Sequence, residues 1–216
     1  MNKQMAKLFN LPVVLTYRLF SDGELMKKVK RKDNMAFDVL YERYVDRVWS
    51  YIFYKVHSQE RAFELTQDVF LKLFNKADLY DEEKKFSSWM WSLVRNHLVD
   101  DFKAKDALAP SSSRAELFNH INGEEDDNRM EDVLFDDHGA DQLFELVLSK
   151  SNLNQIKECF TKLPANQLEV LSLKIFSDQS IEEIALGIKK KSGAVKSLLF
   201  RARDSLRLCL ERSGLI

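Results

Sequence analysis

The chain contains few of the residues that interrupt helices. It has 6 glycines and 3 prolines in 216 residues, whereas these two types make up about 12% of an average protein. A fold with many short strands needs more tight turns than such a sequence provides. We therefore expect an all-α protein built from long helices.

Cysteine and motifs for catalysis are also scarce. Only Cys159 and Cys209 are present, and two cysteines cannot by themselves form a disulfide framework or a structural zinc site. We expect them to be two separate buried thiols in a reducing compartment. The 4 histidines are scattered, and the sequence contains neither an H-E-x-x-H motif nor a glycine-rich phosphate loop. We expect no catalytic residue, no metal site, no cofactor and no enzymatic activity.

Long apolar runs are missing as well. The longest uncharged stretch near the start runs from Leu8 to Tyr17 and is broken by Asn10 and Pro12. It is far shorter than the ~18 apolar residues that a membrane span needs. Arg18 follows it without an A-x-A-like cleavage site, so a signal peptide is not expected. The sequence predicts a cytoplasmic protein without membrane insertion.

The net charge of −1 conceals a strong separation of charge. Residues 1–20 carry +3, residues 21–105 carry +1, residues 106–155 carry −9 and residues 156–216 carry +4. Such a division indicates separate tasks for a basic C-terminal module and an acidic connector.

The acidic connector differs in kind from its surroundings. An Ala-Pro-Ser-Ser-Ser stretch at 109–113 is typical of a linker, and 124–127 is a block of four acidic residues. We expect two helical domains, 21–105 and 155–216, joined by a long acidic linker at 106–154 and preceded by an extension of unknown role at 1–20. For the linker, the sequence is compatible both with an amphipathic helix near 132–148 and with disorder.

Four helices are expected in the first domain. Ser21 and Glu24 form a capping box that starts a helix ending near Lys32. Ser58 starts the third helix, residues 78–85 form a loop, and a fourth helix runs over about 87–103. The second helix has apolar residues at helical spacing: Phe37, Leu40, Tyr41, Tyr44, Val48, Ile52 and Val56. Four helices with short connections can close one core.

The C-terminal domain has the spacing of a helix-turn-helix. Pro164 suits the first position of a helix, and Ser180 with Glu183 forms a second capping box. The apolar positions that would join the two helices of the motif are Ile184, Ala185, Ile188, Val195 and Leu198. From Lys189 to Arg203 the chain has six basic residues and no acidic one. This pattern favours DNA binding over an ordinary helical hairpin with a solvated basic face.

Both halves resemble bacterial sigma factors of the extracytoplasmic-function group. In the C-terminal half the resemblance lies in the L-P of 163–164, the E-I-A of 183–185, the G-A-V-K-S of 193–197 and the R-A-R of 201–203, which are similar to region four. In the first half, A-F-D-V-L-Y-E-R-Y at 36–44, E-L-T-Q-D-V-F at 64–70 and F-S-S-W-M at 86–90 are similar to region two. The sequence departs from the family at Lys189-Lys190, where the turn usually contains Gly-Ile, and after Asp100, where the family is richer in arginine.

The resemblance implies a sigma factor that binds core RNA polymerase, directs it to promoters and helps to open the DNA. Region two would contact the β′ coiled coil of the polymerase through Glu64, Gln67, Asp68, Phe70, Leu71 and Phe74. It would contact the minus-ten promoter element through Phe86, Ser87, Trp89, Trp91, Arg95, Asn96, Asp100 and Lys103. Region four would contact the polymerase β flap, and would read the minus-thirty-five element through Lys190, Lys191, Ser192, Gly193, Lys196, Ser197, Phe200, Arg201 and Arg203. An anti-sigma factor is a further candidate partner.

Several of these residues also have a purely structural interpretation. Trp89 is expected to be mostly core, whereas Phe86 and Trp91 suit either the core or base stacking. Asn96 suits a base edge or a helix end equally. Arg95 and Lys103 are expected to meet phosphate. Two other functions stay open: a helix-turn-helix regulator that binds DNA alone, and a helical interaction protein that does not bind DNA.

Overall fold

The computed structural model describes residues 11–108, 147, 153–177 and 179–216. Every regular element in these ranges is helical, which confirms the all-α prediction. The acidic block at 124–127 and, apart from Val147, the helix considered at 132–148 lie outside the described residues.

The four helices predicted for residues 21–105 are present in order as α3 to α6, and the structure adds a helix at 11–19, in the extension, and a short 3₁₀ helix at 77–79, where a loop was predicted from 78 onward. Ser21 caps the first of the four predicted helices through the expected capping box, because its hydroxyl accepts from the Glu24 N–H and the Glu24 carboxylate accepts from the Ser21 N–H at 2.8 Å. Asp33 caps the next helix by accepting the Met35 and Ala36 N–H groups, and Ser58 caps the one after it by accepting the Arg61 N–H, in both cases without a capping box. The elements are α2 (Leu11–Leu19), α3 (Asp22–Lys30), α4 (Asn34–Val56), α5 (Gln59–Asn75), the short 3₁₀ helix η1 (Ala77–Leu79) and α6 (Phe86–Leu108).

The C-terminal group contains the predicted helix-turn-helix. Its elements are α9 (Leu153–Thr161), α10 (Ala165–Ser177), α11 (Ile181–Gly187) and α12 (Ser192–Arg212). The Ser180–Glu183 capping box is present at the start of α11. Pro164 lies one residue before α10, not at its first position, and its carbonyl accepts the Leu168 N–H at 2.9 Å.

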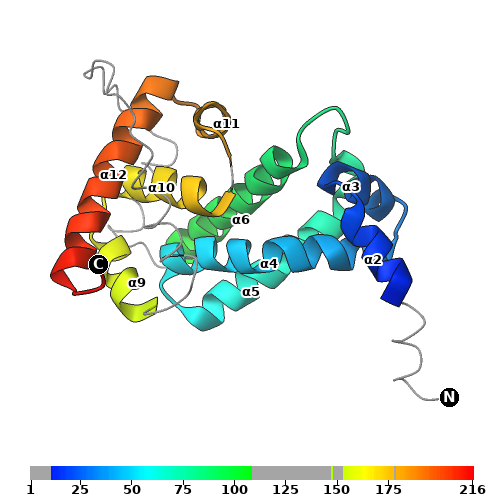
Figure 1. The fold of residues 1–216 in the computed structure, drawn as a ribbon, viewed down its shortest axis with the longest axis horizontal. Coiled ribbons are helices and arrows are strands. Elements are labelled where there is room, and N and C mark those ends of the chain that lie inside the picture. The colour runs from blue at the N-terminus through cyan, green and yellow to red at the C-terminus, as the bar shows by residue number, and fades with distance from the viewer. Residues whose placement is uncertain (1–10, 109–146, 148–152, 178) are drawn as a thin grey trace.

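Helix α10 lies between α12 and the N-terminal helices and joins the two groups (Figure 1). It packs against α12 and α11 on one side and against α4 on the other. Its side chains are buried almost all round, including Glu169 and Ser172. A helix that is buried on every face has no solvent side, so the two predicted domains share one continuous core in this structure.

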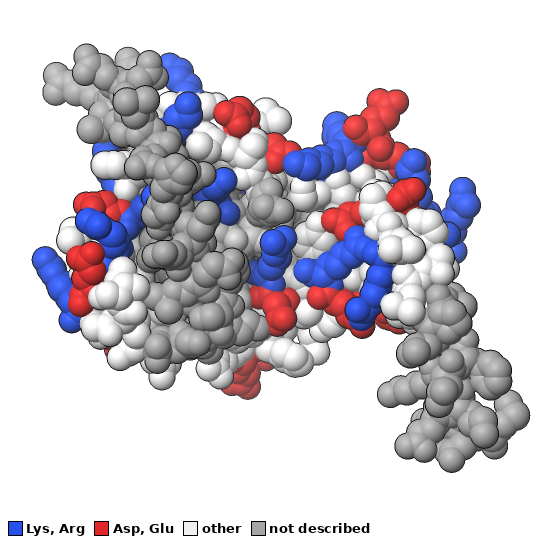
Figure 2. All heavy atoms as spheres, viewed as in Figure 1, with Lys and Arg blue, Asp and Glu red and all other residues white. Residues whose placement is uncertain are grey.

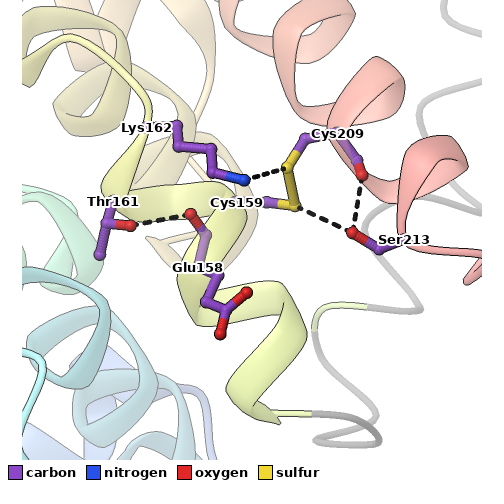
Figure 3. Close-up of a disulfide and its surroundings, with 6 residues drawn as sticks. All are labelled: Glu158, Cys159, Thr161, Lys162, Cys209 and Ser213. Carbon is purple, nitrogen blue, oxygen red and sulfur yellow. Dashed lines mark hydrogen bonds between the residues drawn. A yellow bond between two sulfur atoms is a disulfide. The ribbon is translucent and has the colours of Figure 1, made fainter.

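The two cysteines form a disulfide, so the prediction of separate thiols is wrong. Cys159 on α9 and Cys209 on α12 are 50 residues apart in the chain, but their Cα atoms are 5.7 Å apart (Figure 3). This Cα separation suits a disulfide. The pairing follows from the packing of α9 against α12, which the spacing of the cysteines in the sequence does not show.

Candidate functional site

The outer face of α5 carries an exposed strip that mixes apolar and polar side chains. Phe63 and Leu71 are 56% and 60% exposed. Glu64, Gln67 and Asp68 lie between them on the same face and are also exposed. Large apolar side chains next to polar groups on an open helix face are typical of a protein-binding surface. We call these five residues the α5 strip; Phe63 belongs to it by helical spacing from Leu71, although the sequence motif did not single it out.

Two residues predicted on this surface lie elsewhere. Phe70 is only 2% exposed, and its ring packs edge-on to Tyr41 with 4.7 Å between centroids. Phe74 is half-buried, packs edge-on to Phe37 at 5.4 Å, and lies under the Lys32 ammonium group. The Phe70 ring therefore packs beneath the exposed face of α5, in the core, and is not presented on that face.

The start of α6 is packed more deeply than a DNA-binding surface requires. Phe86 and Trp91 are 3% and 1% exposed, so the structure places both in the core. Trp89 is half-buried and lies against Tyr80 with 5.4 Å between ring centroids. Asn96, Asp100 and Lys103 are exposed on the outer face of the same helix. This exposed face of α6 keeps its capacity for polar contact with nucleic acid.

An open cavity of about 400 Å³ lies beside the start of α6. The Ser87 hydroxyl on its wall is buried and has no hydrogen-bond partner among the described residues. Its lining combines aromatic, basic and acidic side chains with one residue of α10: Tyr44, Tyr80, Phe86, Arg47, Lys84, Lys85, Asp22, Glu82 and Ser177 among others. Aromatic walls offer a stacking surface, while the charges at the rim are of both signs.

Arg95 is held by the C-terminal helices and is not directed to solvent. Its Nε donates to the Glu169 carboxylate on α10 at 3.0 Å, and its guanidinium also donates to the Gly187 carbonyl at the end of α11. The Arg95 guanidinium, which was predicted to contact phosphate, is therefore hydrogen-bonded to other residues of the protein in this structure.

The helix-turn-helix forms as the spacing predicted. Ile184, Ala185, Ile188, Val195 and Leu198 are all buried between α11, α12 and α10. The turn between the two helices begins with Lys189. It is unusual because Lys189 and Lys190 stand where the family usually has Gly-Ile.

Lys189 has the left-handed conformation that normally selects glycine, with φ of 56°. The Lys189 N–H donates to the Leu186 carbonyl at 3.3 Å, and the Lys190 N–H donates to the Ala185 carbonyl at 2.9 Å. This is the hydrogen-bond pattern of a Schellman motif. Lys191 then occupies the N-cap position of α12 without a side-chain hydrogen bond.

The residues predicted to contact DNA lie in the turn before α12 and along the first half of this helix. Lys191, Gly193, Lys196 and Phe200 are exposed, and Phe200 is 47% exposed. The remaining predicted residues are half-buried: Lys190, Ser192, Ser197, Arg201 and Arg203. The N–H groups at the start of a helix also attract phosphate, so this end of α12 suits a DNA backbone.

Charges near the N-terminus are arranged differently. Around α2 and α3, basic and acidic side chains are interspersed on the face shown in Figure 2. Arg18 pairs with Glu42 at 2.7 Å and Lys30 pairs with Glu82 at 3.1 Å. Because these charges neutralise one another locally, this end is less suited than α12 to bind a polyanion.

Two titratable groups have shifted pKa values with clear causes. Burial raises the pKa of the Glu169 carboxyl, but Lys55 and Arg95 outweigh burial and hold it below its ordinary value. Burial lowers the pKa of His97, and the neighbouring Lys72 ammonium group lowers it further. Neither group lies in a cluster suited to a metal, since no three His, Cys, Asp or Glu residues in the described ranges could hold one. Within the same ranges no helix is long and apolar enough to cross a membrane.

Comparison with known proteins agrees with this geometry. Residues 40–107 match the model for Sigma-70 region 2, and residues 153–206 match that for Sigma-70 region 4. The chain is 24% identical over 195 residues to the RNA polymerase sigma-H factor of Pseudomonas aeruginosa, with 88% of this chain and 94% of the relative covered. It is 24% identical over 188 residues to the ECF RNA polymerase sigma factor SigW of Bacillus subtilis, with 84% and 92% covered.

A solved structure shares the fold. The sigma factor RpoE from Bartonella quintana, crystallised with the anti-sigma factor NepR, superposes with a TM-score of 0.56 at 18% identity. The match covers 81% of this chain and 96% of that chain.

Proposed function

Because this chain belongs to the sigma-70 family of RNA polymerase factors, in its extracytoplasmic-function group, we propose that three surfaces of the structure divide the work of a sigma factor between them. The chain binds core RNA polymerase and directs it to promoters. The α5 strip binds the polymerase β′ coiled coil, the outer face of α6 with its adjoining cavity takes the minus-ten element, and the start of α12 reads the minus-thirty-five element.

The α5 strip supports this assignment most directly. It lies within the matched region 2, and it exposes two large apolar side chains, Phe63 and Leu71, to solvent. A regulator that binds DNA alone would not need region 2 or this strip. The matches to both regions in the order of a sigma factor therefore favour the sigma-factor function over that alternative.

Other parts of the assignment extend the same argument. We assign residues 21–105 to region two, residues 155–216 to region four and residues 106–154 to the linker. We also propose that region four contacts the β flap of the polymerase. The protein acts in the cytoplasm with the polymerase and carries no catalytic chemistry of its own. An anti-sigma factor binds the related Bartonella quintana protein, and we propose a partner of that class for this chain.

Run-off transcription tests the function. Core polymerase with this protein as the sole specificity factor should start transcription at defined promoters, and neither component should do so alone. A footprint on promoter DNA by the free protein, without transcription in the presence of polymerase, would instead identify a stand-alone regulator.

A charge reversal tests the polymerase surface. Asp68 is exposed on the α5 strip, so Asp68→Arg should leave the fold intact and weaken retention of core polymerase in a pull-down by about tenfold or more. Asp38→Arg, on an exposed position of α4, is the matched control and should be retained like the wild type. Equal retention of a folded Asp68→Arg protein would contradict the assignment.

A pair of alanine variants separates phosphate contact from base reading. Lys190→Ala should weaken holoenzyme binding about equally for all upstream sequences and reduce the salt slope by about 1. Arg201→Ala should cost ~1–3 kcal/mol on the preferred element and relax preference at one base position. Uniform loss for both variants would show that Arg201 does not read a base.

A further inference from the structure

Helix α6 carries a second row of polar side chains beside the exposed row that was assigned to DNA. Asn96 and Asp100 are exposed, whereas the residues that follow each of them, His97 and Asp101, have side chains only 9% and 10% exposed. Residues four positions apart lie in one row on a helix, and α6 packs against α5. His97 and Asp101 therefore face α5, while Asn96 and Asp100 face outward.

Asp101 is connected to the α5 strip through one arginine. The Arg61 guanidinium group on α5 pairs with Asp101 through Nη2, and its Nη1 donates to the Glu64 carboxylate at 2.6 Å. An exposed pair of charges three positions apart on a helix is weak by itself. Here a carboxylate from a second helix fixes the guanidinium group. Because the donors of Arg form a rigid planar fork, the group that holds Glu64 is fixed as well.

Glu64 is held in a way that still presents it to a partner. Its side chain is 51% exposed, and Arg61 donates to one of its two oxygens, Oε2. A carboxylate can accept hydrogen bonds at both oxygens. A partner group can therefore approach Oε1 while Arg61 holds the orientation of the carboxylate.

His97 faces Asp68 in a similar arrangement, about one turn further along α5. The Lys72 ammonium group lies 2.7 Å from His97 Nδ1, and an ammonium group can only donate. Nδ1 is therefore the acceptor, and the proton of the neutral ring is on Nε2. Nε2 lies 3.7 Å from the Asp68 carboxylate, whose side chain is 55% exposed. The ring thus offers the partial positive charge of an N–H group to this carboxylate from the protein side.

We propose that Asp101 and His97 are positioning residues for polymerase binding, which hold Glu64 and Asp68 in the orientation that the β′ coiled coil recognises. This inference rests on the proposed function. A side chain that is ordered before binding loses less conformational entropy when the partner arrives. Two oriented carboxylates between exposed apolar side chains suit basic groups beside an apolar patch on the partner.

A double-mutant cycle tests the role of Asp101. Asp101→Asn removes the charge that fixes Arg61 and should weaken the binding of core polymerase about three- to tenfold, measured by fluorescence titration of the labelled protein without DNA. Added to Glu64→Gln, it should have no further effect, because Asp101 acts through Glu64. Glu42→Gln, which removes the carboxylate of the Arg18–Glu42 pair, is the matched control and should bind like the wild type.

The cycle separates positioning from stabilisation of the fold. A purely structural Asp101 would lower the melting temperature and would weaken polymerase binding by the same factor with and without the Glu64 carboxylate. Such equal factors, or unchanged binding by a folded Asp101→Asn protein, would overturn the role of Asp101.

Two amide variants test the role of His97. His97→Gln places an amide N–H group near the position of Nε2 and should keep the polymerase affinity. His97→Asn reaches only the position of Nδ1 and should weaken binding about threefold or more. Both variants lose the ring, so a role in packing alone predicts equal affinities. Equal affinities of the two folded variants would overturn the role of His97.

The outcome remains separate from the proposed function. A wild-type protein that does not bind core polymerase would refute the proposed polymerase surface, and the positioning inference with it. Polymerase binding and run-off transcription by the wild type, together with equal factors in the cycle and equal affinities of the two amide variants, would refute the positioning inference alone.

Discussion

At the scale of single residues, Lys189 stores conformational strain at the turn of the helix-turn-helix. A residue with a Cβ atom pays roughly 1–2 kcal/mol in the left-handed region, whereas glycine does not. The Schellman hydrogen bonds of Lys189 and Lys190 hold the chain there despite this cost. The turn therefore keeps the geometry that glycine would favour, although the sequence lacks glycine at this position.

Lys189→Gly should stabilise the protein by roughly 0.5–1 kcal/mol, because the relief of strain exceeds the added freedom of the unfolded chain. Thermal unfolding followed by circular dichroism measures the change. Lys190→Gly, at a neighbouring position without positive φ, is the control and should not stabilise. An unchanged or lower melting temperature for Lys189→Gly would contradict this account of the turn.

His97 is a second residue whose surroundings decide its behaviour. Its Nδ1 lies 2.7 Å from the Lys72 ammonium group, so neutral Nδ1 accepts the hydrogen bond. Protonation would place a second positive charge there, while Asp68, 3.7 Å from Nε2, offsets only part of the repulsion. The folded protein therefore disfavours protonation of this side chain.

Because the pKa of His97 is lowered on folding, the unfolded chain binds more protons just below the ordinary value of 6.5. Stability should therefore fall as the pH falls through 6.5 towards the folded pKa. Urea unfolding at several pH values measures this, and His97→Asn, which keeps an acceptor near Nδ1, should flatten the profile. His57 has a pKa lowered in the same direction, so the flattening is partial; an unaltered slope in His97→Asn would show that His97 is not responsible.

At the scale of helices, the disulfide ties the first helix of the C-terminal group to the last. Cys159 is buried on α9, and Cys209 lies on α12, with the Lys162 ammonium group 3.8 Å from its Sγ and the Ser213 hydroxyl 4.0 Å from the Cys159 Sγ (Figure 3). Closure of a loop of 50 residues restricts the unfolded chain. It therefore stabilises the module that carries the helix-turn-helix.

Reduction of this disulfide should lower the stability of the protein by up to about 4 kcal/mol on the chain-entropy argument. The measurement is the melting temperature with and without dithiothreitol. A protein with Cys159→Ala and Cys209→Ala should melt near the reduced wild type and should not respond to the reductant. The same melting temperature for oxidised and reduced wild type would contradict a stabilising role.

At the scale of the whole molecule, opposite charges are separated along the chain and the two helical groups are joined through α10. The segment 106–155 carries −9 and residues 156–216 carry +4. An acidic segment tethered to a DNA-binding module repels the phosphate backbone and competes with DNA for basic side chains. This charge separation acts against DNA binding by the free protein.

Neutralisation of the acidic block at 124–127 by replacing Glu124 and Glu125 with Gln and Asp126 and Asp127 with Asn should strengthen binding of the free protein to random duplex DNA. Fluorescence anisotropy at low salt is the measurement. At high salt the difference should shrink, since exposed charges are screened over a few ångströms near 1 M. Equal affinities at low salt would show that the segment does not repel DNA.

Local patterns in the sequence determined the helices and much of the candidate functional surface. Three features depend only on residues within a few positions of one another in the chain. They are the two capping boxes, the apolar spacing of the helix-turn-helix and the exposure of Gln67 and Asp68. For such features, side-chain chemistry and helical spacing decide the local structure. The match to the sigma-70 regions has the same origin, because its motifs are short and local.

Tertiary structure alone decided which distant residues meet. Arg95 was predicted to contact phosphate but pairs with Glu169, which is 74 positions away; Cys159 pairs with Cys209; and Phe70 turns into an aromatic cluster. Glu169 did leave a trace in the sequence, as one acidic residue in the otherwise apolar run from Leu168 to Leu171. A burial pattern shows that such a residue needs a partner, but only the packing of α10 between α4, α6 and α12 shows that the partners come from the other half of the chain.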